Sequence, residues 1–211
     1  LKDAGIIDET AKLTAFGELC MEINQENETV LWELIYINLA NNSPLMRWFC
    51  ASVDFNNEID RKDLDRMALE YFQQSFKEST IKYAVQALMQ TFKYSPIGEE
   101  FMQLASLEGK GTGYKRQPYD DLSTEAVAYS LYKYGEQKGI RMFRVSDLYR
   151  PEEDYGMYRE FGINQSELLK KLRSLSAHSD RVLVAELNMG LDHITLREDL
   201  DEVSVLKHLF A

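Results

Sequence analysis

The chain has 211 residues and a formal net charge of −11, with 45% hydrophobic and 11% aromatic residues. This composition excludes a disordered chain and allows one large domain or two small ones with a substantial core. The negative balance argues against a protein that coats nucleic acid indiscriminately, but it leaves room for a local basic face. No apolar run approaches the roughly 18 residues that span a bilayer, and no leader opens the chain, so we expect a cytoplasmic protein without membrane contact.

Residues 1–27 are expected to be the remnant of an N-terminal winged helix. Gly5 would end a first helix, and Thr14 would cap the next one, whose inner face carries Phe16 and Leu19. The chain opens at Leu1 in what reads as the middle of an element, so we expect its own N-terminal part to be missing. An ordinary helix–turn–helix pair is the alternative interpretation of these residues.

Residues 28–118 are expected to form a helical middle domain. The pattern is almost purely helical up to residue 103, with Thr29 as a cap and Pro44 in the first turn of the second helix. Cys20 and Cys50 have no His or Cys at metal spacing, so we expect buried free thiols and neither a metal nor a cofactor.

The helical pattern breaks over residues 107–118, which contain three glycines and three cations: Lys110, Lys115 and Arg116. Glycines allow backbone N–H groups to approach phosphate, and the cations would add charge. The spacing does not fit a P-loop, which needs Gly-Lys-Ser/Thr at the start of a helix. The segment is either a surface loop or a second contact with phosphates.

Residues 119–211 are expected to form a C-terminal winged-helix-like domain. One helix should run from Ser123 to Lys138 and end at Gly139, a short one should start at Ser146, and residues 152–162 should be a loop. From residue 163 leucines recur at helical spacing, and beyond Asp180 the apolar residues alternate, with Val184 inward and a turn at Gly190. A closing amphipathic helix should follow over residues 199–210. The overall expectation is therefore a mainly helical protein: a helical bundle flanked by winged-helix-like ends with small β-hairpins, the N-terminal one truncated.

A basic helix followed by a tight hairpin is typical of modules that place a recognition helix in the DNA major groove. Cations would position such a helix on phosphates, and amides would reach base edges. The candidates on and after this helix are Asn164, Gln165, Lys170, Lys171, Arg173 and Arg181. A solvated helix face is the alternative. No catalytic residue is predicted, because the three histidines have no partners at ligand or triad spacing and the acidic clusters suit helix starts.

Four landmarks appear in order along the chain. They are Leu-Thr-Ala-Phe-Gly-Glu (13–18), Leu-Trp-Glu-Leu-Ile-Tyr-Ile-Asn-Leu-Ala-Asn-Asn (31–42), the pair Trp48-Phe49, and Met-Gly-Leu-Asp-His-Ile (189–194). Together they resemble an uncharacterised bacterial domain family whose genes lie beside phosphoadenosine-phosphosulfate-reductase-like proteins in DNA phosphorothioation and phage-defence islands. The resemblance covers nearly the whole chain. Family members have a motif with Gly and Arg before the C-terminal helix, from which residues 158–162 depart.

The resemblance implies a role in DNA modification or phage defence, with DNA and a phosphoadenosine-phosphosulfate-reductase-like protein as partners, and it supplies no catalytic residues. We therefore expect a non-catalytic accessory DNA-binding protein, with Lys110, Lys115 and Arg116 as a second backbone contact. The alternative is a protein-interaction scaffold for a sulfotransfer or reductase-like enzyme without DNA contact. An enzyme acting on sulfur nucleotides would need a phosphate site, for which only the glycine-rich segment is available.

Overall fold

The protein is mainly helical, with two small three-stranded antiparallel sheets. A computed structural model describes residues 1–23, 27–107, 113–188 and 191–211. The helices are α1 (Ala15–Ile23), α2 (Glu28–Asn42), α3 (Pro44–Ser52), α4 (Arg61–Phe72), α5 (Glu78–Lys93), α6 (Pro96–Glu99), α7 (Thr124–Lys138), the 3₁₀ helix η1 (Val145–Tyr149), α8 (Met157–Phe161), α9 (Gln165–Ala177) and α10 (Glu202–Leu209). No helix within the described ranges is long and apolar enough to cross a membrane.

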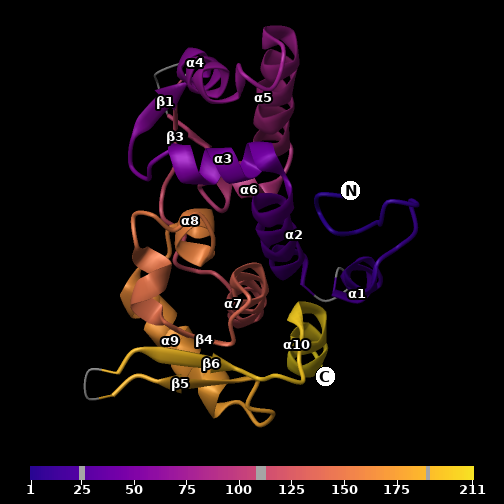
Figure 1. Ribbon diagram of the computed structural model, residues 1–211, viewed down its shortest axis with the longest axis vertical. Helices are drawn as coiled ribbons and strands as arrows, with labels where there is room; N and C mark the ends of the chain where they lie inside the picture. Colours follow the sequence, from indigo (N-terminus) through magenta and orange to yellow (C-terminus); the bar gives the residue numbers. More distant parts are fainter. Residues whose placement is uncertain (24–26, 108–112, 189–190) are drawn as a thin grey trace.

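The strands form two separate sheets. Strands β1 (Glu58–Asp60), β2 (Ala105–Ser106) and β3 (Gly113–Lys115) pair in the order β1-β3-β2. Strands β4 (Met142–Arg144), β5 (Leu183–Glu186) and β6 (His193–Leu196) pair in the order β4-β6-β5. In Figure 1 the two sheets lie toward opposite ends of the long axis, with α2, α3 and α7 between them.

Helix α2 lies at the centre of the core. Its side chains are buried on several sides, and it packs against both α3 and α7. The α2–α7 contact joins residues on the two sides of the domain boundary predicted after residue 118. The cap of α2 is Asn27, whose side chain accepts a hydrogen bond from the N–H of Val30 at 3.2 Å. The predicted cap Thr29 is wrong because the helix starts earlier, which places Thr29 within its first turn.

The sheet of the middle region corrects the prediction that residues 28–103 are almost purely helical. Strand β1 interrupts the helices and pairs with β3, so that Ile59 lies opposite Tyr114. Asp60 then caps α4 by accepting from the N–H of Asp63 at 2.9 Å. A strand of three residues with one buried side chain is too short to show alternation, which is why the sequence pattern did not reveal it.

The end segments agree with several expected helix boundaries. Thr14 accepts a hydrogen bond from the N–H of Gly17 at 2.9 Å, as a cap of α1 should, and an isolated antiparallel bridge joins Ile7 to Leu13. Ser123 caps α7 through the N–H of Ala126. The predicted thiols are confirmed as buried and free: Cys20 and Cys50.

The segment predicted as a loop over residues 152–162 contains a short helix, which corrects that prediction. Met157 and Phe161 bury one side of α8, and Gly162 ends it with a φ of +70°. Only two of its three buried residues are apolar, so no helical period of apolar residues is visible in the sequence. The glycine is required here because this left-handed conformation is strained for other residues.

The predicted helix followed by a hairpin is confirmed as α9, β5 and β6, with one correction to the register. Val184, expected inward, is 48% exposed, whereas its neighbour Leu183 is fully buried. Val182 is buried just before the strand starts, so the inward positions of β5 shift by one residue. The turn predicted at Gly190 lies outside the described residues. Helix α10 closes the chain and packs against α7.

Candidate nucleic-acid interface

Helix α9 starts at a cap held by the rest of the fold. The Asn164 side chain accepts a hydrogen bond from the N–H of Glu167 at 3.0 Å, and the N–H of Asn164 donates to Asp120 at 2.8 Å. Three leucines hold one side of the helix in the core: Leu168, Leu172 and Leu175. Asn164, predicted to reach a base edge, is thus engaged in starting the helix and fixing its position.

The solvent side of α9 carries hydroxyls and cations at helical spacing. We call these four exposed residues the α9 stripe: Ser166, Lys170, Arg173 and Ser174. Gln165 is exposed in the first turn beside them. Lys170 pairs with Glu167 at 2.6 Å, but its side chain is 65% exposed, so the pair is weak and a phosphate could replace the carboxylate. The α9 stripe therefore offers cations for phosphates and hydroxyls for base edges or sugars.

The other two predicted cations of this region lie away from the α9 stripe. Lys171 is half-buried near Glu33 of α2. Burial raises the pKa of Glu33 from 4.5 to about 7, while hydrogen bonds from Ser123 and the charge of Lys171 lower it. Arg181 is exposed after α9 ends, with a φ of +43°. Of the two, only Arg181 is fully exposed to solvent.

The outer face of the β4-β6-β5 sheet carries a row of charged and polar side chains that the sequence did not indicate. Arg144 lies opposite His193, which lies opposite Glu186. A second row joins Met142, Thr195 and Val184, and its two apolar ends are exposed. The strand β4 is three residues long, so only its partner strands show that Arg144 belongs to this sheet.

The second phosphate contact that was predicted for Lys110, Lys115 and Arg116 does not form one site in the structure. Lys110 lies outside the described residues. Lys115 is half-exposed on β3, in the sheet at the other end of the molecule from α9 (Figure 1). Arg116 is fully buried, so its guanidinium cannot reach a DNA phosphate in this fold, which corrects the prediction for this residue.

Arg116 instead ties the middle region to the C-terminal region. Nη1 donates to the carbonyls of Cys50 and Val53 at 2.9 and 3.0 Å, at the end of α3. Nη2 donates to the carbonyls of Arg159 and Glu160, at the end of α8. Carbonyls of a last helical turn have no partner within their helix, and the helix dipole favours a cation beside them.

Two further contacts hold the guanidinium of Arg116, one with an amide and one with an aromatic ring. Nε donates to the side-chain oxygen of Gln103 at 3.0 Å, and the guanidinium lies 4.0 Å from the centre of the Phe55 ring. No pattern in the Gly-Tyr-Lys-Arg segment (113–116) signals this role. A lone arginine beside surface lysines does not reveal it.

The chain resembles known proteins in its fold. No protein-family model and no curated protein matches it. Its fold, however, is shared with SspB. The SspB crystal structure matches 98% of this chain and 63% of its own, with a TM-score of 0.66 and 16% identity. The magnesium ion-bound SspB crystal structure matches 88% of this chain and 60% of its own, with the same TM-score and identity.

The likeness to SspB is therefore one of fold. This chain spans about three fifths of the SspB chain, and the match runs through nearly all of the fold described above, both sheets included. One of the SspB structures holds a magnesium ion. In the part of this chain that the structure describes, no three His, Cys, Asp or Glu side chains are grouped so that they could hold a metal ion.

Proposed function

We propose that the chain is a non-catalytic accessory DNA-binding component of a DNA-modification or phage-defence system. The observation that carries this proposal is the α9 stripe, which presents Lys170 and Arg173 to solvent next to two hydroxyl side chains. The proposal assigns phosphates to the two cations and places the helix against the duplex.

The order of elements supports a winged-helix assignment for the C-terminal region. Helix α7 is followed by β4, by η1 and α8, by α9, and then by the β5–β6 hairpin, and the sheet order is β4-β6-β5. A module of this kind places its third helix in the major groove and its hairpin beside it. In this proposal α9 is the recognition helix, and Arg181 lies where the chain passes from that helix to the hairpin.

The net charge of −11 does not contradict a local contact, because the acids are distributed elsewhere. Helix α9 carries three cations and one carboxylate, Glu167. Attraction to phosphates decays within about 10 Å at 0.1 M salt, so the nearest charges decide whether the helix can approach DNA. We therefore expect binding that is weak and strongly dependent on salt.

The proposed place in a modification or defence system rests on the four sequence landmarks and their family resemblance. The fold shared with SspB is consistent with it. A phosphoadenosine-phosphosulfate-reductase-like protein is the partner that the resemblance implies.

A second candidate function is that of a docking scaffold without DNA contact. The exposed apolar row on the outer face of the C-terminal sheet favours it, since Met142 is 61% and Val184 48% exposed. In this case the reductase-like partner would cover Met142 and Val184. The variant Met142→Asp with Val184→Asp should abolish co-purification of that protein, whereas retained co-purification would contradict the scaffold.

The DNA proposal is tested by fluorescence anisotropy with a labelled duplex at several salt concentrations. The variant Lys170→Glu with Arg173→Glu should bind more weakly than wild type, and the slope of log K against log salt should shrink by roughly one per lost phosphate contact. A matched control reverses two exposed lysines outside α9, Lys12→Glu with Lys207→Glu, and should bind nearly as wild type does. Equal losses in both variants would show that only net charge matters and would refute the assignment to α9.

A further inference from the structure

The middle region repeats the element order of the C-terminal region. Helix α3 is followed by β1, α4, α5, β2 and β3, and the sheet order is β1-β3-β2. The first strand pairs with the third in both sheets, and the third pairs with the second. Two differences remain: the middle region has the short helix α6 between α5 and β2, and its single helix α4 stands where the C-terminal region has η1 and α8. Helix α5 therefore holds the position in the middle region that α9 holds in the C-terminal region.

Helix α5 divides into a buried and an exposed side. Four apolar side chains face the core: Ile81, Val85, Leu88 and Phe92. The opposite side carries Tyr83, Gln86, Gln90 and Lys93, all exposed, and we call these residues the α5 face. The only carboxylate of the helix is Glu78 at its start, which pairs with Lys82 at 2.5 Å. In a chain of net charge −11, this helix is cationic.

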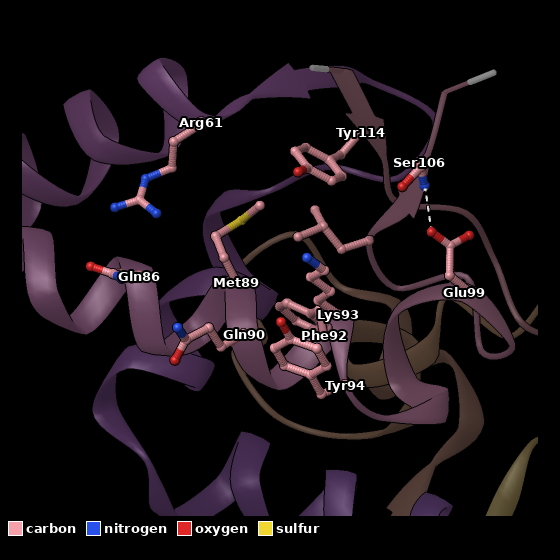
Figure 2. Close-up of a pocket in the computed structure, with 11 residues that line it drawn as sticks. Arg61, Gln86, Met89, Gln90, Phe92, Lys93, Tyr94, Glu99, Ser106 and Tyr114 are labelled. Atoms are coloured by element: carbon pink, nitrogen blue, oxygen red, sulfur yellow. Dashed lines mark hydrogen bonds between the residues drawn. The ribbon is translucent and has the colours of Figure 1, made fainter. Parts of the chain in front are cut away.

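A cavity of about 420 Å³ lies beside the C-terminal half of the α5 face (Figure 2). Gln86, Gln90 and Lys93 line it from α5, Arg61 from the start of α4, and Tyr114 from β3. About half of its lining is polar, which is more than the mostly apolar lining that small-molecule pockets usually have.

The charges around this cavity favour an anionic ligand. Arg61 donates to the carbonyl of Lys82 at 3.2 Å, which fixes the guanidinium between α4 and α5. Asp65 pairs with Arg61 at 3.0 Å from outside the cavity lining. Glu99 is the carboxylate among the lining residues, and one of its oxygens already accepts from the N–H of Ser106 at 3.0 Å. Figure 2 shows Glu99 on the side of the cavity away from Arg61.

We propose that the α5 face and the adjoining cavity form a second binding face for double-stranded DNA. Arg61 and Lys93 contact phosphates, and the amides of Gln86 and Gln90 contact base edges, because an amide can donate to and accept from one base at the same time. This inference rests on the proposed function in that both require DNA. It goes beyond the proposed function because it gives the middle region a DNA contact of its own. The residues of this contact differ from Lys115 and the buried Arg116, which the sequence had suggested for that role.

The test uses the full chain, a labelled duplex of about 25 base pairs and fluorescence anisotropy at 50 mM salt and above. Lys93→Glu should lower the affinity about tenfold and reduce the salt slope by about one. Gln86→Ala with Gln90→Ala should weaken binding while leaving the salt slope unchanged. Lys207→Glu on α10, which also reverses one exposed lysine, serves as the matched control. All the substituted side chains are exposed, and thermal melting of each variant checks that it is folded.

The two proposals fail in different ways. If Lys93→Glu binds as wild type does while Lys170→Glu with Arg173→Glu loses affinity, the α5 face is refuted and the α9 assignment stands. If the loss follows Lys93→Glu alone, the α5 face stands and the α9 assignment is refuted. If the wild-type chain binds no duplex at 50 mM salt, both are refuted.

Discussion

The fully buried Arg116 yields the sharpest prediction about stability. Arg116→Met keeps an unbranched side chain but removes every donor. The backbone carbonyls of Cys50, Val53, Arg159 and Glu160 would then lose this partner. Removing a buried charge also relieves the cost of desolvating it, but the carbonyls belong to the backbone and stay in place, three of them in buried contacts.

The magnitude follows from these acceptors. A buried acceptor without a partner costs about 1–3 kcal/mol, so three buried carbonyls and the part-buried carbonyl of Arg159 give a loss of about 4 kcal/mol, near the lower end of the range. Whole domains are stable by about 5–15 kcal/mol, so this one change removes a large part of the total. Arg116→Lys should lie between wild type and Arg116→Met, because an ammonium has three donors and lacks the planar fork.

Urea unfolding followed by circular dichroism measures this effect. With a slope of about 2 kcal/mol per molar, a loss of 4 kcal/mol lowers the urea midpoint by about 2 M. Lys115→Met, at the half-exposed neighbouring position, should change the free energy of unfolding by less than about 0.5 kcal/mol. The structural role would be refuted if the urea midpoint of Arg116→Met were close to that of wild type. Loss of DNA binding by the same variant would then show that Arg116 contacts DNA after all.

Three further predictions concern a buried acid, a glycine and a cap. Burial raises the pKa of Glu160 from 4.5 to about 7. Between these two pH values the carboxyl of Glu160 is protonated in the folded chain and ionised in the unfolded chain, so the free energy of unfolding falls as the pH rises toward and through 7. Glutamine does not titrate, so the free energy of unfolding of Glu160→Gln, measured in urea, should rise relative to that of wild type by on the order of 2–3 kcal/mol from pH 5 to pH 8. A difference between the two proteins that is the same at both pH values would contradict the raised pKa. Gly162→Ala should lower the melting temperature, because its φ is +70° and an added Cβ would lie 2.7 Å from the ring of Phe55; an unchanged melting temperature would show that the ring moves freely. Asn164→Ala should cost about 1 kcal/mol as a lost cap, and Asn164→Ser should restore most of it.

Local chemistry was sufficient to predict several helix boundaries. Ser123 and Thr14 cap helices because their side chains satisfy N–H groups a few residues away, and Pro44 starts one because its ring suits a first turn. The leucine spacing of α9 likewise identified its buried side. These features involve neighbours within one or two turns of the chain, so the sequence carries them directly.

The candidate site was predictable only in part. The exposure of Lys170 and Arg173 follows from the helical period of α9, and the structure places both on one stripe. The half-burial of Lys171 near Glu33 does not follow from that period, because it depends on where α2 lies. The position of Lys115, on the other sheet, depends on a strand of three residues that no periodicity reveals.

The helical character of the chain, several of its caps and the cationic side of α9 follow from the sequence alone, since each depends on side chains close together along the backbone. Three features follow only from the fold: Arg116 joins two helix ends in the core, Val184 faces outward, and α5 occupies the place in its region that α9 occupies in the other. These features depend on pairings between residues far apart in the chain. Burial, strand register and the free carbonyls that attract a cation exist only once those distant segments have met.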